Sequence, residues 1–190
     1  MATQTIVDVK SKIRDVKDFP KEGIIFRDIT TALKDAETLR VIVDYLCEQF
    51  KDEKIDYIAG IESRGFILGM PMAYKMGIGF VPVRKPNKLP AATYSQEYSL
   101  EYGTDKIEIH QDAFPQGANV LVVDDLLATG GTAEAACKLV KKAGVSTVMI
   151  TGDSKDTAIN IAKEIGIIDS KNDIVLTSDE LNSMTSDEIK

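Results

Sequence analysis

The segment from Val120 to Thr132, Val-Leu-Val-Val-Asp-Asp-Leu-Leu-Ala-Thr-Gly-Gly-Thr, constrains the fold of this chain more than any other segment. It predicts a buried strand that ends in two carboxylates, then a glycine turn and a helix capped by Thr132. Glycines let backbone N–H groups point at an anion, and the helix N-terminus adds about half a positive charge. No lysine follows the glycines, so this is not the ATP-type loop G-x-x-x-x-G-K-[ST]. We expect the loop to hold a compact phosphate monoester.

The two carboxylates, Asp124 and Asp125, would repel a phosphate unless they face something else. Adjacent strand residues point to opposite sides, so one carboxylate can bind a sugar diol while the other orders water around Mg²⁺. An acidic strand end beside an ordinary glycine turn is the alternative for the Asp-Asp pair taken alone.

Two further loops contain residues that could bind groups of a ligand. Ile61-Glu-Ser-Arg-Gly65 follows a predicted strand, and Arg64 offers a planar fork that suits phosphate oxygens while Gly65 permits close approach. Together with the glycine turn, it predicts a substrate with phosphate at both ends and hydroxyls between them. In the second loop, Phe26 could stack on a flat ring, and the neighbouring backbone could form hydrogen bonds with the edge of that ring. Taken alone, Arg64 would be a surface arginine and Phe26 a core residue.

Strands and helices alternate along the chain. Apolar spacing predicts helices over 37–50, 66–76, with a kink or displacement at Pro71, and 132–143. Strands are expected at 55–61, 79–83, 106–110 and 119–123, with a polar stretch at 84–104. This order favours an α/β fold with a mostly parallel sheet, whose ligands bind beyond the carboxyl ends of the strands.

Composition narrows the function classes. The 190 residues are 44% hydrophobic, enough for a core, and 30 acidic against 23 basic residues leave a net charge of −7, which argues against a nucleic-acid partner. No apolar run approaches the roughly 18 residues of a membrane span, and residues 1–10 are too polar for a secretory signal. One histidine and two separated cysteines, Cys47 and Cys137, favour neither a zinc site nor a disulfide. We expect a soluble, cytoplasmic protein.

Four strings in this order resemble the adenine phosphoribosyltransferases. They are Phe26-Arg-Asp-Ile-Thr30, Glu62-Ser-Arg-Gly-Phe66, Tyr98-Ser-Leu-Glu-Tyr-Gly103 and Val122-Val-Asp-Asp-Leu-Leu-Ala-Thr-Gly-Gly-Thr132. The resemblance covers about residues 9–144. It implies a type I phosphoribosyltransferase-like α/β fold, a mostly parallel sheet flanked by helices, with a mobile hood loop over 84–104.

The resemblance also implies the reaction: adenine and 5-phosphoribosyl 1-diphosphate give AMP and diphosphate, with Mg²⁺ bound mainly through substrate and water near the Asp-Asp pair, in a homodimer. Carried over residue by residue, the substrate-binding residues would be Phe26 and the Arg27 backbone for adenine, Arg64, Arg84 and Lys85 for the diphosphate, Asp124 and Asp125 for the ribose hydroxyls, and Ala128, Thr129, Gly130, Gly131 and Thr132 for the 5′-phosphate.

The hood would bring Glu101 and Tyr102 to the substrates as it closes. Adenine must lose a ring proton as it attacks, so Glu101 is expected to be the general base. Tyr94, Tyr98 and Tyr102 suit a lid, with apolar bodies over the substrate and solvated hydroxyls.

The resemblance ends near Ala143-Gly144. Residues about 145–182, above all Val148-Met-Ile-Thr-Gly-Asp-Ser-Lys-Asp-Thr, instead resemble a phosphorylation-domain segment of P-type cation-transporting ATPases, without the Asp-Lys-Thr-Gly-Thr nucleophile string. We expect a phosphoribosyltransferase domain at 1–144 and an atypical extension at 145–190. Its strand (145–150) and helix (157–165) would pack on the same sheet before an acidic tail. Such a chimera leaves open a phosphoribosyl-diphosphate sensor, an inactive hybrid or an enzyme for another purine.

Overall fold

The computed structural model describes residues 9–99, 103–126 and 130–145, and a three-stranded parallel sheet is its centre. Strand β3 (Tyr57–Ile61) lies between β4 (Gly79–Val83) and β7 (Val120–Val123). Tyr57 is level with the first residue of both neighbours, so the three strands run in step and end at one edge. The turns that follow them therefore meet there.

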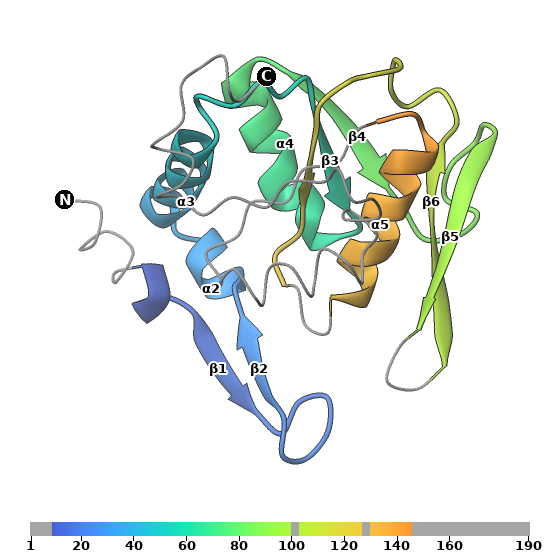
Figure 1. The fold of residues 1–190 in the computed structure, drawn as a ribbon. Coiled ribbons are helices and arrows are strands. Elements are labelled where there is room, and N and C mark those ends of the chain that lie inside the picture. Colours follow the sequence, from blue (N-terminus) through green and yellow to red (C-terminus); the bar gives the residue numbers. More distant parts are fainter. Residues whose placement is uncertain (1–8, 100–102, 127–129, 146–190) are drawn as a thin grey trace, which may run out of the picture.

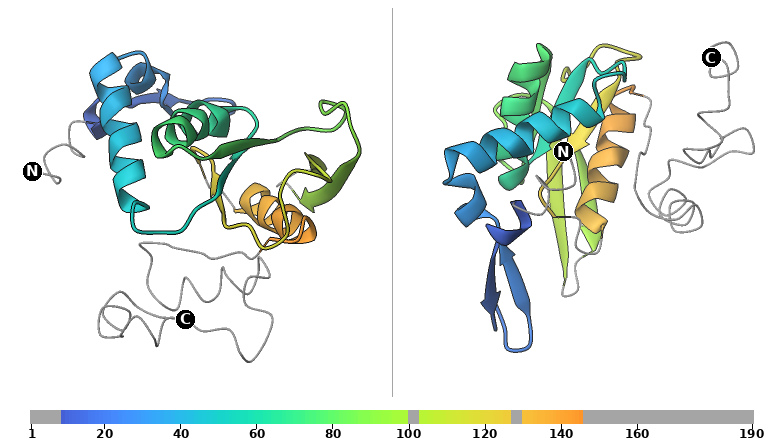
Figure 2. Two further views of the ribbon diagram at one scale, coloured as in Figure 1. Left: turned by 90° about the horizontal axis from the view of Figure 1, so that it is seen from above. Right: turned by 90° about the vertical axis from the view of Figure 1, so that its left-hand side faces the viewer.

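Helices cover both faces of this sheet (Figures 1 and 2). Helices α3 (Ala36–Gln49) and α4 (Arg64–Met76) pack on one face, and α5 (Gly131–Lys142) packs on the other. Along β3, Ile58 faces α3 and α4, whereas Ala59 and Ile61 belong to the core around α5. This alternation explains the near-continuous apolar run of β3, which is buried on both faces.

The polar stretch expected to form a hood contains a strand that the sequence analysis missed. Strands β5 (Thr93–Ser99) and β6 (Thr104–His110) form an antiparallel hairpin, and Arg84 bridges the end of β4 to Glu108 of β6. The hairpin is packed on α5 along its length: Tyr98, near its turn, and Ile107 and Ile109 are at most 8% exposed and share a core with that helix. The hood is thus anchored in the main core.

A second hairpin projects from the body of the molecule (Figure 1). It consists of β1 (Arg14–Lys17) and β2 (Ile25–Asp28), paired antiparallel, and it leads into the short helix α2 (Thr30–Leu33). The sequence predicts only a loop here, because these strands have four residues each and face solvent on much of their surface. The hairpin carries Phe26 towards the carboxyl edge of the sheet.

The predicted α/β fold with a parallel sheet is confirmed, and the predicted helices and strands agree with the structure to within about two residues. Pro71 lies inside α4, which continues through it. One expectation is wrong: Thr132 does not cap α5. The N-cap is Gly130, whose φ of +81° is a left-handed conformation that favours glycine, and no side chain caps the helix. The predicted elements at 145–150 and 157–165 lie outside the described residues apart from Val145.

Candidate functional site

Arg64 brings the three predicted loops together. It is the first residue of α4, placed directly after the turn that ends β3. Its Nε lies 2.8 Å from Asp125 Oδ2, on the loop after β7, and its Cζ lies 5.6 Å from the centre of the Phe26 ring, on β2. Three segments that together span about a hundred residues of chain thus meet at one guanidinium.

A cavity of about 400 Å³ opens beside Arg64, in the size range of small-molecule sites. It is lined by Val16, Phe19, Phe26, Asp28, Ile29, Thr30 and Arg64. The Phe26 ring meets Phe19 edge to face, with ring centres 5.3 Å apart. An aromatic wall with a cation at one end suits a flat, polar-edged heterocycle.

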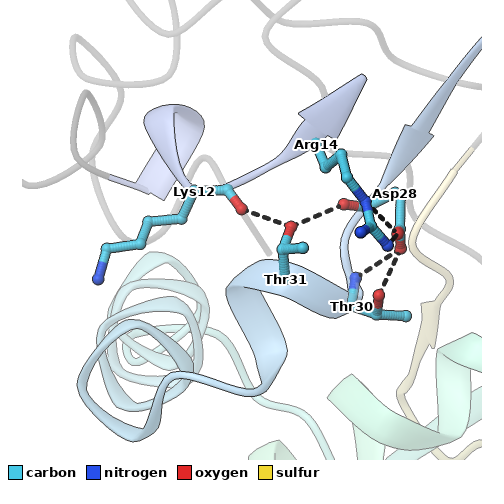
Figure 3. A network of polar contacts seen from close by, with 5 residues as sticks. All are labelled: Lys12, Arg14, Asp28, Thr30 and Thr31. Carbon is cyan, nitrogen blue, oxygen red and sulfur yellow. Dashed lines mark hydrogen bonds and ion pairs between the residues drawn. The ribbon is translucent and has the colours of Figure 1, made fainter. Parts of the chain in front are cut away.

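Asp28 holds the wall of this cavity in place (Figure 3). Its carboxylate accepts hydrogen bonds from Thr30 N (2.9 Å), Thr30 Oγ1 (2.6 Å) and Arg14 Nε (3.1 Å). These bonds, led by the Thr30 hydroxyl, lower the pKa of Asp28 to about 2. Nearby, Thr31 Oγ1 donates to the Lys12 carbonyl oxygen at 2.6 Å. Asp28 therefore joins both strands of the hairpin to α2 as an ionised group.

The Arg27 side chain turns away from this cavity. Its guanidinium is exposed and forms an ion pair with Asp15 across the β1–β2 hairpin. Only the backbone of Arg27 was expected to contact a base, and its side chain instead stabilises the hairpin that carries Phe26.

The two carboxylates after β7 differ in environment. The Asp125 side chain is only 6% exposed and pairs with Arg64. Asp124 Oδ1 accepts a hydrogen bond from Asp125 N at 2.9 Å, but burial, reinforced by the charge of Asp125, raises the pKa of Asp124 to about 6. The pair therefore offers one carboxylate neutralised by arginine and one that ionises near neutral pH.

Gly65 allows the turn after β3 to approach β7. A Cβ added at Gly65 would overlap the carbonyl oxygen of Val123 and would lie 3.4 Å from the Asp124 Cα. Any larger residue would push the Arg64 turn away from the Asp-Asp pair. Gly65 thus permits a close approach of backbone to backbone, and the close approach of a phosphate expected there stays a prediction.

Arg84 and Lys85, at the root of the hood, are each paired with a carboxylate. Arg84 Nε and Nη2 donate to Glu62 at 3.2 and 3.3 Å. Lys85 Nζ forms an ion pair with Asp105 and donates to Tyr98 Oη at 2.8 Å. Sequence reasoning missed these two acids, because nothing in the pattern links strand ends that are distant in sequence.

The expectation that Tyr98 is a lid residue with a solvated hydroxyl is wrong. Its ring is buried against α5 and its hydroxyl is bonded to Lys85 and Asp105. Glu101 and Tyr102 lie outside the described residues, as do Ala128 and Thr129. Of the predicted phosphate loop, the structure describes Gly130, Gly131 and Thr132, at the start of α5.

Within the described ranges, no cluster of three or more histidine, cysteine, aspartate or glutamate side chains could cage a metal ion. The same ranges contain no helix that is long and apolar enough to cross a membrane.

A phosphoribosyl transferase domain family model matches residues 30–175. The chain is 63% identical over 134 residues to an adenine phosphoribosyltransferase of Acaryochloris marina, covering 70% of this chain and 79% of that protein. It is 58% identical over 144 residues to the adenine phosphoribosyltransferase of Nostoc punctiforme, covering 75% of this chain and 84% of that one. Three of the four predicted strings lie within residues 30–175, and the string from Phe26 to Thr30 lies at its start, only Thr30 being inside the matched range.

Solved structures show the same similarity. The adenine phosphoribosyltransferase of Thermoanaerobacter pseudethanolicus superposes with a TM-score of 0.72 at 54% identity, covering 74% of this chain and 81% of the other. The enzyme from Saccharomyces cerevisiae, solved with adenine and an imino-altritol bisphosphate, gives a TM-score of 0.72 at 41% identity, covering 75% and 84%. That second protein binds a base together with a compound that carries two phosphates.

Proposed function

Because this chain belongs to the adenine phosphoribosyltransferase family, we propose a role in its reaction for each residue of the site. The fold is the type I phosphoribosyltransferase fold. The chain transfers the phosphoribosyl group from 5-phosphoribosyl 1-diphosphate to adenine, giving AMP and diphosphate, a reaction of purine salvage. The observation that carries the assignment is the contact of Arg64 with both Asp125 and Phe26.

Arg64 binds the diphosphate of the substrate, with Arg84 and Lys85 contributing from the root of the hood. A guanidinium suits this role because it is always charged and presents paired N–H groups to phosphate oxygens. Asp125 orients Arg64 through the 2.8 Å ion pair. The 5′-phosphate binds to residues 128–132, where the left-handed Gly130 opens α5.

Phe26 binds adenine in the cavity beside Arg64, and the backbone at Arg27 reads the edge of the base. Support comes from the aromatic wall that Phe19 and Phe26 form and from the rigid Asp28 network behind it. Glu101 takes the ring proton of adenine as the base attacks, and Tyr102 accompanies it on the hood.

The reaction replaces one bond at the anomeric carbon with another, and this exchange determines which charges the site must stabilise. The C1–O bond to diphosphate breaks and the C1–N bond to adenine forms, so the ribose becomes cationic while the leaving group gains charge. Asp124 and Asp125 bind the ribose hydroxyls, and the ionised Asp124 stabilises the cationic ribose. Arg64 stabilises the departing diphosphate. The hood excludes water that would otherwise capture the sugar.

Magnesium fits this donor set as an ion shared with the substrate. Asp124 and Asp125 would hold it, mainly through water, and it would neutralise charge on the diphosphate as that group departs. Two adjacent carboxylates, one of them paired with Arg64, offer too few ligands for a metal site of protein groups alone.

The test is AMP formation from adenine and phosphoribosyl diphosphate with Mg²⁺, with hypoxanthine and guanine assayed alongside. Adenine-selective turnover supports the assigned site. Equal turnover of another purine would overturn the base assignment. No turnover, together with thermal stabilisation by phosphoribosyl diphosphate, would instead identify a sensor or an inactive hybrid.

Residues 145–190 are proposed to be an extension of different origin, related to the P-type ATPase segment and packed on the same sheet. Support comes from the matched length of 134 and 144 residues in the two bacterial relatives and from the string at 148–157. The family model, which extends to residue 175, weighs against it. Limited proteolysis tests the packing: a stable core that ends near Gly144 would contradict an integrated extension.

A cytoplasmic homodimer is the proposed state of the enzyme. Helix α4 exposes Ile67 (46%), Met70 (51%) and Tyr74 (89%) at helical spacing, an apolar stripe of the kind that subunit contacts cover. Cys47 and Cys137 are free thiols, as in a reducing compartment. A molar mass near 21 kDa in light scattering would rule out the dimer.

A further inference from the structure

Glu62 connects the Arg64 turn to the root of the hood. It follows β3 directly, and its backbone N donates to the Val83 carbonyl oxygen at 2.8 Å, which extends the pairing of β3 with β4 by one residue. Its carboxylate then accepts three hydrogen bonds, from Arg84 Nε (3.2 Å), Arg84 Nη2 (3.3 Å) and Lys85 N (3.0 Å). Both carboxylate oxygens are used.

These contacts fix the direction of the Arg84 guanidinium. Its Nη1 donates to the Lys88 carbonyl oxygen at 3.2 Å, so Arg84 is held on three sides. Of the five N–H bonds of a guanidinium, three are used in this way by described residues, and the described part of the chain leaves two for a ligand. The Glu62 side chain is 20% exposed and that of Arg84 is 31% exposed, which places the pair at the border of solvent.

A carboxylate at this position needs a reason, because Glu62 is two residues from Arg64 and would repel a bound diphosphate. Its hydrogen bonds with Arg84 and Lys85 hold the pKa of Glu62 below its usual value, so it is ionised at neutral pH. The charge is neutralised by Arg84. Glu62 can thus align a cation without presenting a bare negative charge to the substrate.

We propose that Glu62 is a positioning residue for the diphosphate: it aligns Arg84 and the Lys85 backbone with the Arg64 turn, so that cations directly after β4 and at the start of α4 converge on one leaving group. The inference rests on the proposed binding of diphosphate by Arg64 and Arg84. Glu62 itself acts through Arg84 and does not contact the substrate.

Glu62→Gln removes the charge and one of the two acceptor oxygens while keeping the length of the side chain. We expect KM for phosphoribosyl diphosphate to rise about tenfold, as for loss of a charge-assisted pair. KM for adenine should change less than twofold, because Phe26 and its cavity are untouched. The stabilisation of the folded protein by phosphoribosyl diphosphate, seen as a rise in Tm, should shrink in parallel.

Arg84→Lys supplies a second variant that keeps the charge but loses the two-point contact with Glu62. If Glu62 acts through Arg84, the variant that combines Glu62→Gln with Arg84→Lys should raise KM for phosphoribosyl diphosphate no more than the more damaging of the two single substitutions does. Asp44→Asn is the matched control, because it breaks an ion pair with Lys75 that also joins two elements but lies on α3 and α4 away from the site. Both KM values should stay unchanged in it.

The positioning role would be overturned if Glu62→Gln raised both KM values equally, or if it lowered the Tm of the free protein without a selective change in KM. It would also be overturned if the effects of the two single substitutions on KM multiplied in the double variant. If the unaltered protein formed no AMP, the proposed function would fail instead. The stabilisation by phosphoribosyl diphosphate would then still decide the role of Glu62.

Discussion

Arg64 and Asp125 form an ion pair between the turns that follow two neighbouring parallel strands, with Nε 2.8 Å from Oδ2 and the Asp125 side chain almost completely buried. Removing the arginine therefore has two consequences. The diphosphate that we propose Arg64 binds would lose its cation, and a buried carboxylate would lose its partner.

Arg64→Ala should raise KM for phosphoribosyl diphosphate by at least about tenfold and lower Tm. Arg64→Lys keeps the charge without the fork, so it should restore part of the Tm and less of the affinity. Steady-state kinetics with each substrate varied in turn, together with a thermal melt, measure both effects. An unchanged KM for phosphoribosyl diphosphate in Arg64→Ala would remove its assigned role.

Phe26→Ala should raise KM for adenine by about tenfold, because the base loses a stacking partner. KM for phosphoribosyl diphosphate should change little. The control is Ile25→Ala on the same strand, where the side chain is 53% exposed and does not line the cavity. The assignment fails if the two variants have the same KM for adenine.

Asp124→Asn should change how stability depends on pH. The folded protein holds the pKa of Asp124 at about 6, above its usual 3.8, so folding favours the protonated form. That favourable contribution is present below about pH 4 and is lost as pH rises through 6. The Tm of Asp124→Asn minus that of the parent should therefore increase from pH 4 to pH 7, as followed by melts in a series of buffers. A difference that does not vary with pH would contradict the raised pKa.

Gly65→Ala should lower Tm by roughly 5 °C, since its Cβ would overlap the Val123 carbonyl oxygen and overpacking costs about 1–3 kcal/mol. Turnover should fall as well, because the turn shifts relative to Asp124. Gly77→Ala serves for comparison: its φ of +70° makes alanine strained, but none of the described residues lies within 4 Å of the added carbon. It should cost stability without changing either KM. Normal kinetics in Gly65→Ala would show that the close approach is not needed by the site.

Glu101→Gln should reduce kcat at least about 100-fold while both KM values stay within a few-fold, as expected when a general base is lost. Single-turnover kinetics on the adenine reaction separate this effect from product release. Near-normal turnover would assign the proton to another group.

Much of the fold could be predicted because its central strands and helices show their burial in the sequence. Strand β3 is apolar throughout and α3 repeats apolar residues at helical spacing, so both follow from pattern alone. Strand β5, Thr-Tyr-Ser-Gln-Glu-Tyr-Ser, carries no such signal, because its residues are mostly polar and its burial comes from packing on α5, which is distant in sequence.

The residues of the site could likewise be predicted only in part. Arg64 and Asp125 follow predicted parallel strands, and their proximity follows from the edge at which β3 and β7 both end. The approach of Phe26 to Arg64 could not be predicted in this way, because Phe26 lies on the separate β1–β2 hairpin. The partners of Arg84 and Lys85 did not follow, since Glu62 and Asp105 are brought to them by the relative placement of β3, β4 and β6. Tyr98 looked like a lid residue because its sequence neighbours are polar, yet tertiary packing buries it.

The central position of β3 has a consequence for preparations of the protein. Its last residues pair with β4 on one side and β7 on the other, with Ile61 opposite Val83 and Gly60 opposite Val123. A slip by one residue would turn every side chain of β3 to the wrong face and would separate the Arg64 turn from both partners at once. The specific activity of a preparation therefore depends on the fraction of molecules in which β3 is in register.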